Sequence, residues 1–425
     1  MAQKFWFKLD NAAKLYPAIA NRSWMSMFRL TAELTENVNP QVLQKALDET
    51  IRRFPTMNVR LRAGLFWYYL EEVPGRLLVR PDEGHPCMPF SSKRDGSFLI
   101  RVFYFGRRIS AEFFHVLTDA SGGLAFLKTL TVRYLQLMGH DVSFDQGALD
   151  INAAPTDEET QDAFCSIDLP KVRINRSVEK TYHIPSTQEI PHTLHIIAAS
   201  ISCDALLQKA HEKHVTLTEY LTALILYSAY LCQQQDHKKR RLPLRVSVPV
   251  NLRSLYGIGT MRNFSSFVNP SIDPRLGEYT FEEICNCVHN YMAYHCTKKQ
   301  LSAAIATNVS DEKYLIIRLA PLFLKNLVIS SVFRRSGDLH FTSTLSNIGR
   351  TGIPTGAEQL IRRFEFLLGV PYAPVCNCAC ISSGNELRLT FSRNIHETTL
   401  PRVLLSTLVE MGIPVTVDSN DQEDE

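Results

Sequence analysis

The sequence has almost no excess of charge of either sign. Its 425 residues contain 46 lysines and arginines against 43 aspartates and glutamates, so the formal net charge is only +3. A protein that binds nucleic acid uses a much larger positive surplus to neutralise phosphates, and dedicated DNA or RNA binding is therefore not expected. Hydrophobic residues at 45% and charged residues at 21% match a folded globular chain, which excludes a disordered or collagen-like protein.

Cysteine is also scarce. The ten cysteines in 425 residues are far fewer than a disulfide-stabilised secreted domain contains. The first residues, Met1–Asp10, lack the basic-then-apolar pattern and the small-residue cleavage site of a signal peptide. A reducing, cytoplasmic location is the expectation that follows.

Uninterrupted hydrophobic runs of membrane-spanning length are missing. Leu217–Leu231 is short and carries several polar side chains, and the longer segment Tyr314–Phe333 is interrupted by two basic residues and a proline. The basic residues, Arg318 and Lys325, are seven apart, so we predict that they form the wet edge of a helix that is otherwise mostly buried. A helix lying in a lipid interface is the alternative. No transmembrane span is expected.

Several catalytic signatures are absent as well. The chain has no glycine-rich phosphate loop, no HExxH motif and no GxSxG motif, which argues against a kinase, a zinc protease or a serine hydrolase. Cys376, Cys378 and Cys380 alternate along a predicted strand, but they lack the CxxC spacing of a zinc site. We interpret them as small buried thiols and expect no bound metal.

Strand-like and helix-like patterns alternate along the chain, which predicts a mixed α/β protein. A long polar stretch, Asp145–Pro185, separates two halves, and a structureless loop of that length is uncommon inside one compact domain. We therefore predict an N-terminal lobe at residues 1–150, a crossover linker at 151–190 and a C-terminal lobe at 191–417. A solvated acidic tail at 418–425 is expected to follow.

Local signals predict several individual elements. Asn39 followed by Pro40 is typical of a helix start, because the side chain can cap the helix and proline has no N–H to satisfy. Phe98–Phe105 and Ile109–Val116 are predicted to pair as a hairpin around Gly106. Thr216–Glu219 matches a capping box, which predicts the beginning of a long apolar helix.

The segment Phe113–Gly123 carries the strongest chemical signal. His115 leaves an apolar strand where a helix begins, an aspartate follows four residues later, and two glycines allow another backbone or a ligand to come close. A histidine side chain has an unperturbed pKa of about 6.5, which suits proton abstraction near neutral pH. A structural histidine at the end of a strand is the alternative interpretation.

The motif His115–Asp119, followed closely by glycine, resembles the HxxxD motif of the chloramphenicol acetyltransferase-like superfamily. That superfamily includes alcohol acetyltransferases, polyketide-associated acyltransferases and the condensation domains of peptide synthetases. Three further segments fit the resemblance in the expected order along the chain: Arg52–Arg62, Val248–Arg253 and Ser346–Gly349. Each motif alone is weak, and their order carries the resemblance.

The resemblance implies a pseudo-dimer of two chloramphenicol acetyltransferase-like lobes, each a mixed β-sheet with helices, with a tunnel between them. His115 would lie at the middle of the tunnel as the general base of an acyltransferase. It would take the proton of an alcohol or amine as that group attacks an acyl thioester, without a covalent acyl-enzyme. Asp119 would form a salt bridge to an arginine, with Arg253 the first choice and Arg262 and Arg60 as alternatives.

The resemblance also suggests supporting residues. Ser346 and Asn347 are candidate donors to the oxyanion of the tetrahedral intermediate, with a role in shaping the turn before Gly349 as the alternative. Gly122 and Gly123 are candidate tunnel positions.

The implied donor is an acyl-coenzyme A co-substrate or an acyl carrier protein, and no tightly bound cofactor is expected. The basic residues Lys238, Lys239 and Arg240 could contact the phosphates of coenzyme A, although a solvated loop explains them equally. The acceptor and the acyl length stay open, and a monomer is expected.

Two departures from the family pattern bear on function. The residue after Asp119 is Ala120 where the family has glycine, and Phe114 replaces the second histidine that is common in condensation domains. Both departures motivate an alternative function, a catalytically degenerate module that keeps the tunnel for binding or recruitment. The second also argues against a role in peptide synthesis. The DFGWG motif of the plant branch of the family is absent as well, which favours a stand-alone alcohol acetyltransferase-like protein.

Overall fold

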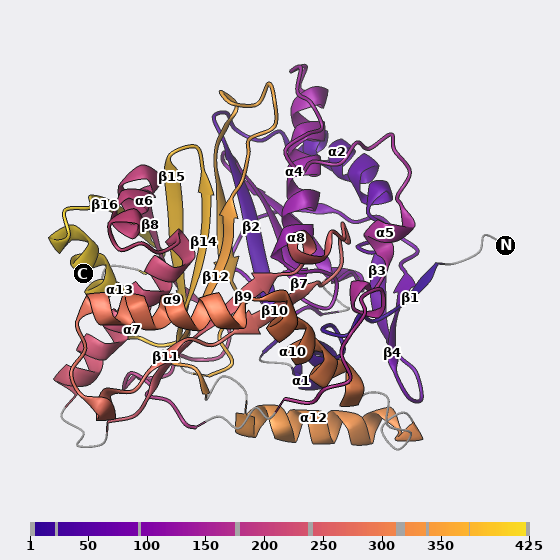
Figure 1. Ribbon diagram of the computed structural model, residues 1–425. Coiled ribbons are helices and arrows are strands. Elements are labelled where there is room, and N and C mark those ends of the chain that lie inside the picture. Colours follow the sequence, from indigo (N-terminus) through magenta and orange to yellow (C-terminus); the bar gives the residue numbers. More distant parts are fainter. Residues whose placement is uncertain are drawn as a thin grey trace.

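The computed structural model describes residues 5–21, 24–91, 95–174, 179–236, 241–311, 319–336, 340–373 and 375–421. Two large β-sheets, each covered by helices, form two lobes that lie side by side (Figure 1). Each lobe has its own cluster of buried hydrophobic side chains. The mixed α/β class and the two-lobed arrangement predicted from the sequence are therefore confirmed.

The sheet of the first lobe has five strands. Their order across the sheet is β13 (Ile361–Leu368), β2 (Met27–Leu34), β7 (Arg108–Phe114), β6 (Ile100–Phe105) and β5 (Val79–Pro81). Only the β5–β6 pair is parallel. Strands β6 and β7 form the predicted hairpin, and Gly106 takes the positive φ of 52° that its turn requires.

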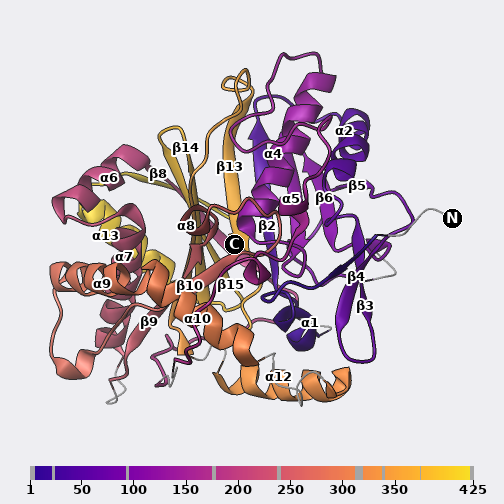
Figure 2. The same ribbon diagram turned by 45° about the vertical axis from the view of Figure 1, so that its right-hand side comes forward.

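Two helices, α2 (Pro40–Arg53) and α4 (Ala120–Leu137), pack against each other in this lobe, and α4 also packs on β2 and β7. The side chain of Asn39 accepts hydrogen bonds from the N–H groups of Gln41 and Val42, so α2 begins where the sequence predicts. Figure 2 shows α2 and α4 together on the outer side of this lobe.

The second lobe is built on an eight-stranded mixed sheet. The strand order is β10 (Ser265–Val268), β9 (Leu244–Asn251), β12 (Ser343–Arg350), β14 (Cys376–Ser383), β15 (Glu386–Arg393), β8 (His195–Ser202) and β16 (Val415–Ser419), with β11 (Ser271–Ile272) also paired to β9. Strand β12 runs parallel to both of its neighbours.

The helices of this lobe pack mostly through α7 (Leu217–Gln235), which contacts α6, α9, α13 and strand β9. The bounds of these partners are Cys203–Glu212 for α6, Phe281–His295 for α9 and Thr399–Glu410 for α13. The predicted capping box is present at the start of α7, where Thr216 and Glu219 each bond the other's backbone N–H.

Shorter elements connect the lobes and flank them. Strands β1 (Trp6–Lys8), β4 (Tyr68–Glu72) and β3 (Val59–Ala63) form a small antiparallel sheet. The remaining helices are α1 (Leu15–Ile19), α5 (Asp157–Thr160), η1 (Ala163–Cys165), α8 (Arg253–Tyr256), η2 (Pro274–Leu276), α10 (Lys298–Asp311) and α12 (Leu322–Ser336).

The lobes do not follow the sequence division at every point. Strand β13 falls within the range 191–417 expected for the C-terminal lobe, but it pairs along its length with β2 of the first lobe. The acidic tail was expected to start at residue 418, but Asp418 and Ser419 belong to β16 and pair with β8. Asp418 also forms an ion pair with the buried Arg388, and this contact and the backbone ladder hold the segment on the sheet.

Helix α12 differs from the expectation of a mostly buried helix with a charged wet edge. Arg318 and the rest of 312–318 lie outside the described residues. Lys325 is buried, and the exposed side chains described for the helix are apolar except for Ser331. The burial of Lys325 is compensated because its Nζ donates to the carbonyl oxygen of Phe66 at 2.9 Å and lies 3.4 Å from the centre of the Trp67 ring.

Among the described residues, no single helix combines the length and the hydropathy needed to cross a membrane. By length and composition alone, α6 and α7 could do so together as a pair bent by 82°.

Candidate active site

His115 lies at the end of β7, in the short connection that leads into α4. Its backbone N–H donates to the carbonyl oxygen of Ser26 at 2.9 Å, and β2 begins one residue later, so the end of the neighbouring strand fixes this position. The transition from a strand to a helix that the sequence predicts at this position is therefore present. It places the histidine close to the second lobe, since Asn263 on the β9–β10 connection contacts its ring.

Two aromatic rings enclose the imidazole of His115. Tyr16 on α1 stacks on it with ring centres 4.6 Å apart and an interplanar angle of 24°, and Phe28 on β2 meets it edge-on at 5.3 Å. Removal from water lowers the pKa of His115 below its usual 6.5, and this effect outweighs the opposing charge of Asp119. The imidazole is therefore neutral at neutral pH.

Asn263 fixes which imidazole nitrogen carries the proton. Its Nδ2 group donates to the carbonyl oxygen of His115 at 3.0 Å and to Oδ2 of Asp10 at 3.2 Å. Both of these partners are acceptors, so the amide oxygen must face Nδ1 of His115, 2.9 Å away. Nδ1 therefore carries the proton and Nε2 has the free lone pair that a general base needs.

Asp10 supports this amide from a fully buried position. Its Oδ1 accepts from the N–H of Ala13 at 2.7 Å, and Arg262 lies 3.5 Å from Oδ2. Burial raises the pKa of Asp10 to about 6, against the opposing charge of Arg262. The carboxylate is mainly ionised at neutral pH, so it acts there as an acceptor for Asn263.

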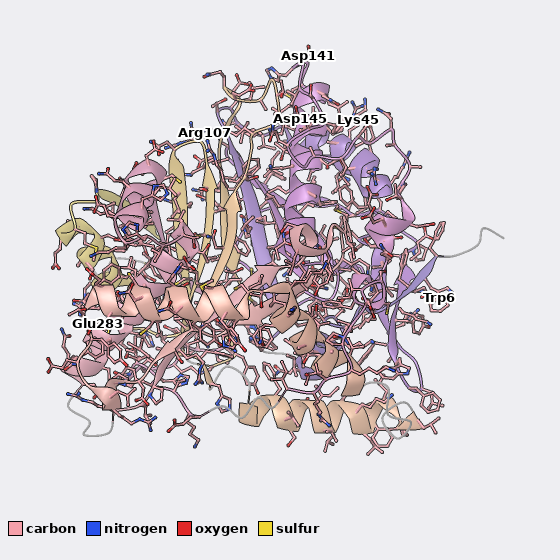
Figure 3. The ribbon with its side chains drawn as sticks, viewed as in Figure 1. Trp6, Lys45, Arg107, Asp141, Asp145 and Glu283 are labelled. Carbon is pink, nitrogen blue, oxygen red and sulfur yellow. The ribbon has the colours of Figure 1, made fainter. Side chains whose placement is uncertain are left out.

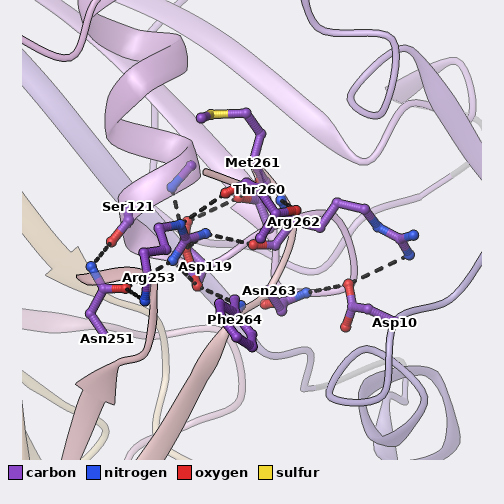
Figure 4. A network of polar contacts seen from close by, with 12 residues as sticks. Asp10, Asp119, Ser121, Asn251, Arg253, Thr260, Met261, Arg262, Asn263 and Phe264 are labelled. Carbon is purple, nitrogen blue, oxygen red and sulfur yellow. Dashed lines mark hydrogen bonds and ion pairs between the residues drawn. The ribbon is translucent and has the colours of Figure 1, made fainter. Parts of the chain in front are cut away.

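Asp119 pairs with Arg253, the first of the three arginines considered from the sequence. The pair is bidentate, with Nη1–Oδ2 at 2.8 Å and Nη2–Oδ1 at 2.9 Å (Figure 4). Of the two alternatives, Arg262 contacts Asp10 and Arg60 contacts Glu71.

Hydrogen bonds complete the surroundings of this ion pair. The N–H groups of Phe264 and Gly122 donate to Asp119 at 2.9 and 3.3 Å, while Arg253 donates to the carbonyl oxygens of Thr260 and Arg262. Burial opposes ionisation of Asp119, but the charge and hydrogen bonds of Arg253 outweigh it and hold its pKa below the usual range. The pair thus ties the start of α4 in the first lobe to the β9–β10 connection of the second.

Gly122 and Gly123 allow the first turn of α4 to lie close to the Met261 backbone and to the Phe28 ring. A Cβ atom on Gly122 would lie 2.2 Å from the carbonyl oxygen of Met261, and one on Gly123 would lie 2.8 Å from the ring of Phe28. These contacts give both glycines a packing role between the two lobes and against β2. Their role as tunnel positions stays a prediction.

Ser346 and Asn347 lie on β12, where they pair with Ala379 and Cys380 of β14. The side chain of Asn347 donates to the hydroxyl of Thr218 at 2.9 Å and accepts from the N–H of Gly349 at 2.7 Å. The second contact matches the alternative role in shaping the chain before Gly349. The oxyanion role of both residues stays a prediction.

The basic residues Lys238, Lys239 and Arg240 lie outside the described residues. The three cysteines of β14 are buried in the core of the second lobe, as expected. Burial raises the pKa of Cys376 to about 12, so its thiol is protonated at neutral pH. Within the described part of the chain, no group of three or more His, Cys, Asp or Glu side chains could hold a metal ion.

A cavity of about 510 Å³ lies between the two large sheets, lined by residues of β2, β8, β13 and β15. Arginines and acidic residues share its lining, including Arg29, Asp82, Glu365 and Arg388. His115 and the other site residues expected from the sequence are not among the residues that line this cavity. The predicted central tunnel past His115 therefore stays a prediction.

Sequence reasoning missed part of the surroundings of His115. Asn263 carries no chemical signal of its own in the sequence, and its amide role depends on Asp10, which is 253 residues away. Tyr16 carries no local signal, because its segment is a five-residue helix. Only the folded chain shows the contact of Asn263 with Nδ1 of His115.

Comparison with known proteins supports the fold through structure alone. No protein-family model matches the sequence, and no curated protein sequence matches it significantly. Solved structures match over nearly the whole chain.

TRI101 of Fusarium sporotrichioides, solved with coenzyme A and T-2, gives a TM-score of 0.61 at 13% identity, covering 97% of this chain and 99% of its own. Polyketide synthase associated protein 5 of Mycobacterium tuberculosis gives 0.56 at 14%, with 96% of each chain covered. The first condensation domain of the CDA synthetase gives 0.56 at 13%, covering 96% and 95%. The chain therefore has the two-lobed fold of the chloramphenicol acetyltransferase-like and condensation-domain acyltransferases.

Proposed function

We propose that this protein is an acyltransferase that moves an acyl group from a thioester to an alcohol or amine, with His115 as the general base. One observation carries the proposal. The imidazole is neutral, and Asn263 holds the proton on Nδ1, so Nε2 is left with the lone pair. A histidine that served only to cap a strand would not need its tautomer fixed by a buried amide and carboxylate.

The reaction follows from this arrangement. Nε2 of His115 takes the proton of the acceptor as its oxygen or nitrogen attacks the thioester carbonyl, and a tetrahedral intermediate forms. The intermediate collapses with cleavage of the C–S bond, and the imidazolium returns the proton to the departing thiolate. A positioned general base contributes about 10²–10⁴-fold to the rate. Asp119 bonds to Arg253 and so positions the loop without taking part in proton transfer.

Acyl-coenzyme A is the proposed donor. This assignment is supported by the structural likeness to TRI101, whose solved structure contains coenzyme A. An acyl carrier protein is the alternative donor, and the likeness to a condensation domain favours it. Ser346 and Asn347 stay the candidates for stabilising the oxyanion.

The test is the release of free coenzyme A, measured by mass spectrometry with a panel of acyl-coenzyme A donors and alcohol or amine acceptors. His115→Ala should lower turnover at least about a hundredfold while the circular dichroism spectrum stays that of the folded protein. His140→Ala is the matched control, because His140 follows the far end of α4, and its turnover should not change. Undiminished turnover of His115→Ala would refute the mechanism.

The alternative is a non-catalytic binding or recruitment module. The stacking of Tyr16 on His115 favours it, since one face of the imidazole is already covered by protein. This alternative predicts that thioesters bind, by calorimetry, with no release of coenzyme A for any donor and acceptor in the panel. It also predicts that His115→Ala alters neither observation.

A further inference from the structure

Tyr16 brings a hydroxyl group close to the proposed base. Its ring is stacked on the imidazole of His115, with the ring centres 4.6 Å apart. Removal from water is the main cause that raises the pKa of this phenol, yet among the described residues its hydroxyl has no hydrogen-bond partner. A polar group in such surroundings is normally paired with protein, water or a ligand. The partner of the Tyr16 hydroxyl therefore has to come from water or from a bound substrate.

Two carboxylates of the candidate site act on this hydroxyl. Burial raises the pKa of Tyr16, and the negative charges of Asp10 and Asp119 raise it further. The hydroxyl is therefore close enough to both carboxylates for their charge to matter, and it keeps its proton at every pH at which His115 could act as a base. It can donate a hydrogen bond, but it is too weak a base to take the proton of the acceptor itself.

The position of Tyr16 is fixed by the same residues that orient the imidazole. Oδ1 of Asp10 accepts a hydrogen bond from the N–H of Ala13 at 2.7 Å, two residues before α1 begins. Oδ2 of the same carboxylate accepts from the amide of Asn263, which in turn faces Nδ1 of His115. One buried carboxylate thus connects the chain that carries the tyrosine ring with the amide that sets the tautomer of the histidine.

The stacked arrangement covers the face of the imidazole and leaves its edge free. The lone pair of Nε2 lies in the plane of the imidazole ring and points outward from that edge. The two rings are nearly parallel, with an angle of 24° between their planes. A substrate group bound at Nε2 of His115 therefore lies next to the ring of Tyr16 and is not displaced by it.

We propose that the Tyr16 hydroxyl donates a hydrogen bond to the oxyanion of the tetrahedral intermediate, an inference that rests on the acyl transfer proposed above. As the acceptor attacks, the electron pair of the C=O π bond moves onto the carbonyl oxygen, and it returns when the C–S bond breaks. A donor directed at that oxygen stabilises the transition state more than the bound substrate.

The contacts of Asn347 favour Tyr16 as a donor in addition to the candidates on β12. The side-chain amide of Asn347 already donates to the hydroxyl of Thr218 and accepts from the N–H of Gly349. The hydroxyl of Tyr16 has no such contact in the described part of the chain. It can therefore turn toward a developing oxyanion without breaking a hydrogen bond within the protein.

Tyr16→Phe tests the proposal, because it keeps the stacked ring and removes only the hydroxyl. With a donor and acceptor pair that the unaltered protein turns over, kcat should fall about a hundredfold, while KM should change less than about twofold. The melting temperature should not fall, since the lost hydroxyl has no partner within the described protein.

Tyr104→Phe is the matched control. Tyr104 lies on β6 and pairs with Ile109 at the start of β7, whereas His115 follows the end of β7. Figure 3 shows Arg107, in the turn between these two strands, at the end of the molecule opposite α1. The kinetic constants of this variant should equal those of the unaltered protein.

A binding measurement tests the same contact without turnover. Trifluoroacetonyl-coenzyme A is a ketone that forms a tetrahedral hydrate, and the hydrate places an oxygen where the oxyanion would develop. By calorimetry, Tyr16→Phe should bind this analogue at least about tenfold more weakly than the unaltered protein does, while both proteins should bind acetyl-coenzyme A equally.

Three results would overturn the proposal: an unchanged kcat in Tyr16→Phe, a rise in KM alone, or equal binding of the analogue by both proteins. The variants also separate this inference from the proposed function. If turnover is lost in His115→Ala but kept in Tyr16→Phe, the general base stands and only the role of the tyrosine is refuted. Undiminished turnover in both variants refutes the general base as well.

Discussion

The ion pair between Asp119 and Arg253 offers the sharpest test of how the two lobes are joined. Asp119→Asn keeps the shape of the side chain but removes its charge, and the Arg253 side chain, only 14% exposed, is then left without a counter-charge. Removing one partner of a buried ion pair costs about 3–5 kcal/mol, because the remaining charge stays desolvated. The free energy of unfolding should fall by that amount at neutral pH.

The corresponding shift in melting temperature follows from the size of the chain. Unfolding entropy is about 2.1 cal/mol/K per residue, so cooperative unfolding of all 425 residues gives about 0.9 kcal/mol/K and a fall of about 3–6 °C. The pKa of Asp119 is lowered in the folded protein, so the contribution of the pair is complete above the unfolded pKa near 3.8 and disappears as pH falls through the folded pKa.

A double-mutant cycle isolates the pair itself. Asp119→Asn, Arg253→Met and the double variant are compared by urea denaturation, and the double variant should recover part of the loss because no unpaired charge remains. The exposed pair Asp48–Arg76 is the control, with side chains 27% and 61% exposed, and its coupling should be far smaller because water screens it. A coupling for Asp119–Arg253 below about 1 kcal/mol would show that the reasoning is wrong.

Two further predictions concern the base and the close approach of the lobes. Because the pKa of His115 is lowered below 6.5, the acid limb of kcat/KM should be centred below pH 6.5, with a fall of about tenfold per pH unit once the imidazole is mostly protonated. An acid limb centred above 6.5 would contradict the desolvated site. Gly122→Ala should lower the free energy of unfolding by about 1–3 kcal/mol, since its Cβ would meet the Met261 carbonyl oxygen at 2.2 Å. Gly75→Ala, where only Val73 lies within 4 Å at 3.9 Å, should be nearly neutral by the same denaturation assay.

The α/β elements could be predicted where their signals are local. The Asn39 cap, the Thr216 capping box and the Gly106 turn depend on residues within a few positions of each other, and all three appear as predicted. The transition from β7 to α4 also depends on neighbouring residues, because Asp119 caps α4 by accepting a hydrogen bond from the N–H of Gly122. The spacing between His115 and Asp119 was therefore informative before any contact across the lobes was known.

Contacts between distant segments could not be predicted in the same way. Asn263 is 148 residues from His115, yet it holds the proton on Nδ1. Strand β13 belongs to the first lobe although it comes late in the chain. Its pairing with β2 depends on which strand edge is available in the folded protein, and its own amino-acid composition does not indicate this. The order of the motifs indicated which segments of the chain lie close together, but it did not indicate which atoms form the contacts between them.

The sequence by itself determined the mixed α/β class, the two halves and the position of His115 between a strand and a helix, because periodicity, caps and turns are encoded by neighbouring residues. Tertiary structure alone decided the tautomer of His115 and the orientation of α12. The sequence pattern predicts that Lys325 faces water, but the carbonyl of Phe66 and the ring of Trp67 hold it inward. The hydrogen bonds that orient a helix come from segments far away in the chain, so its exposed face is a property of the fold.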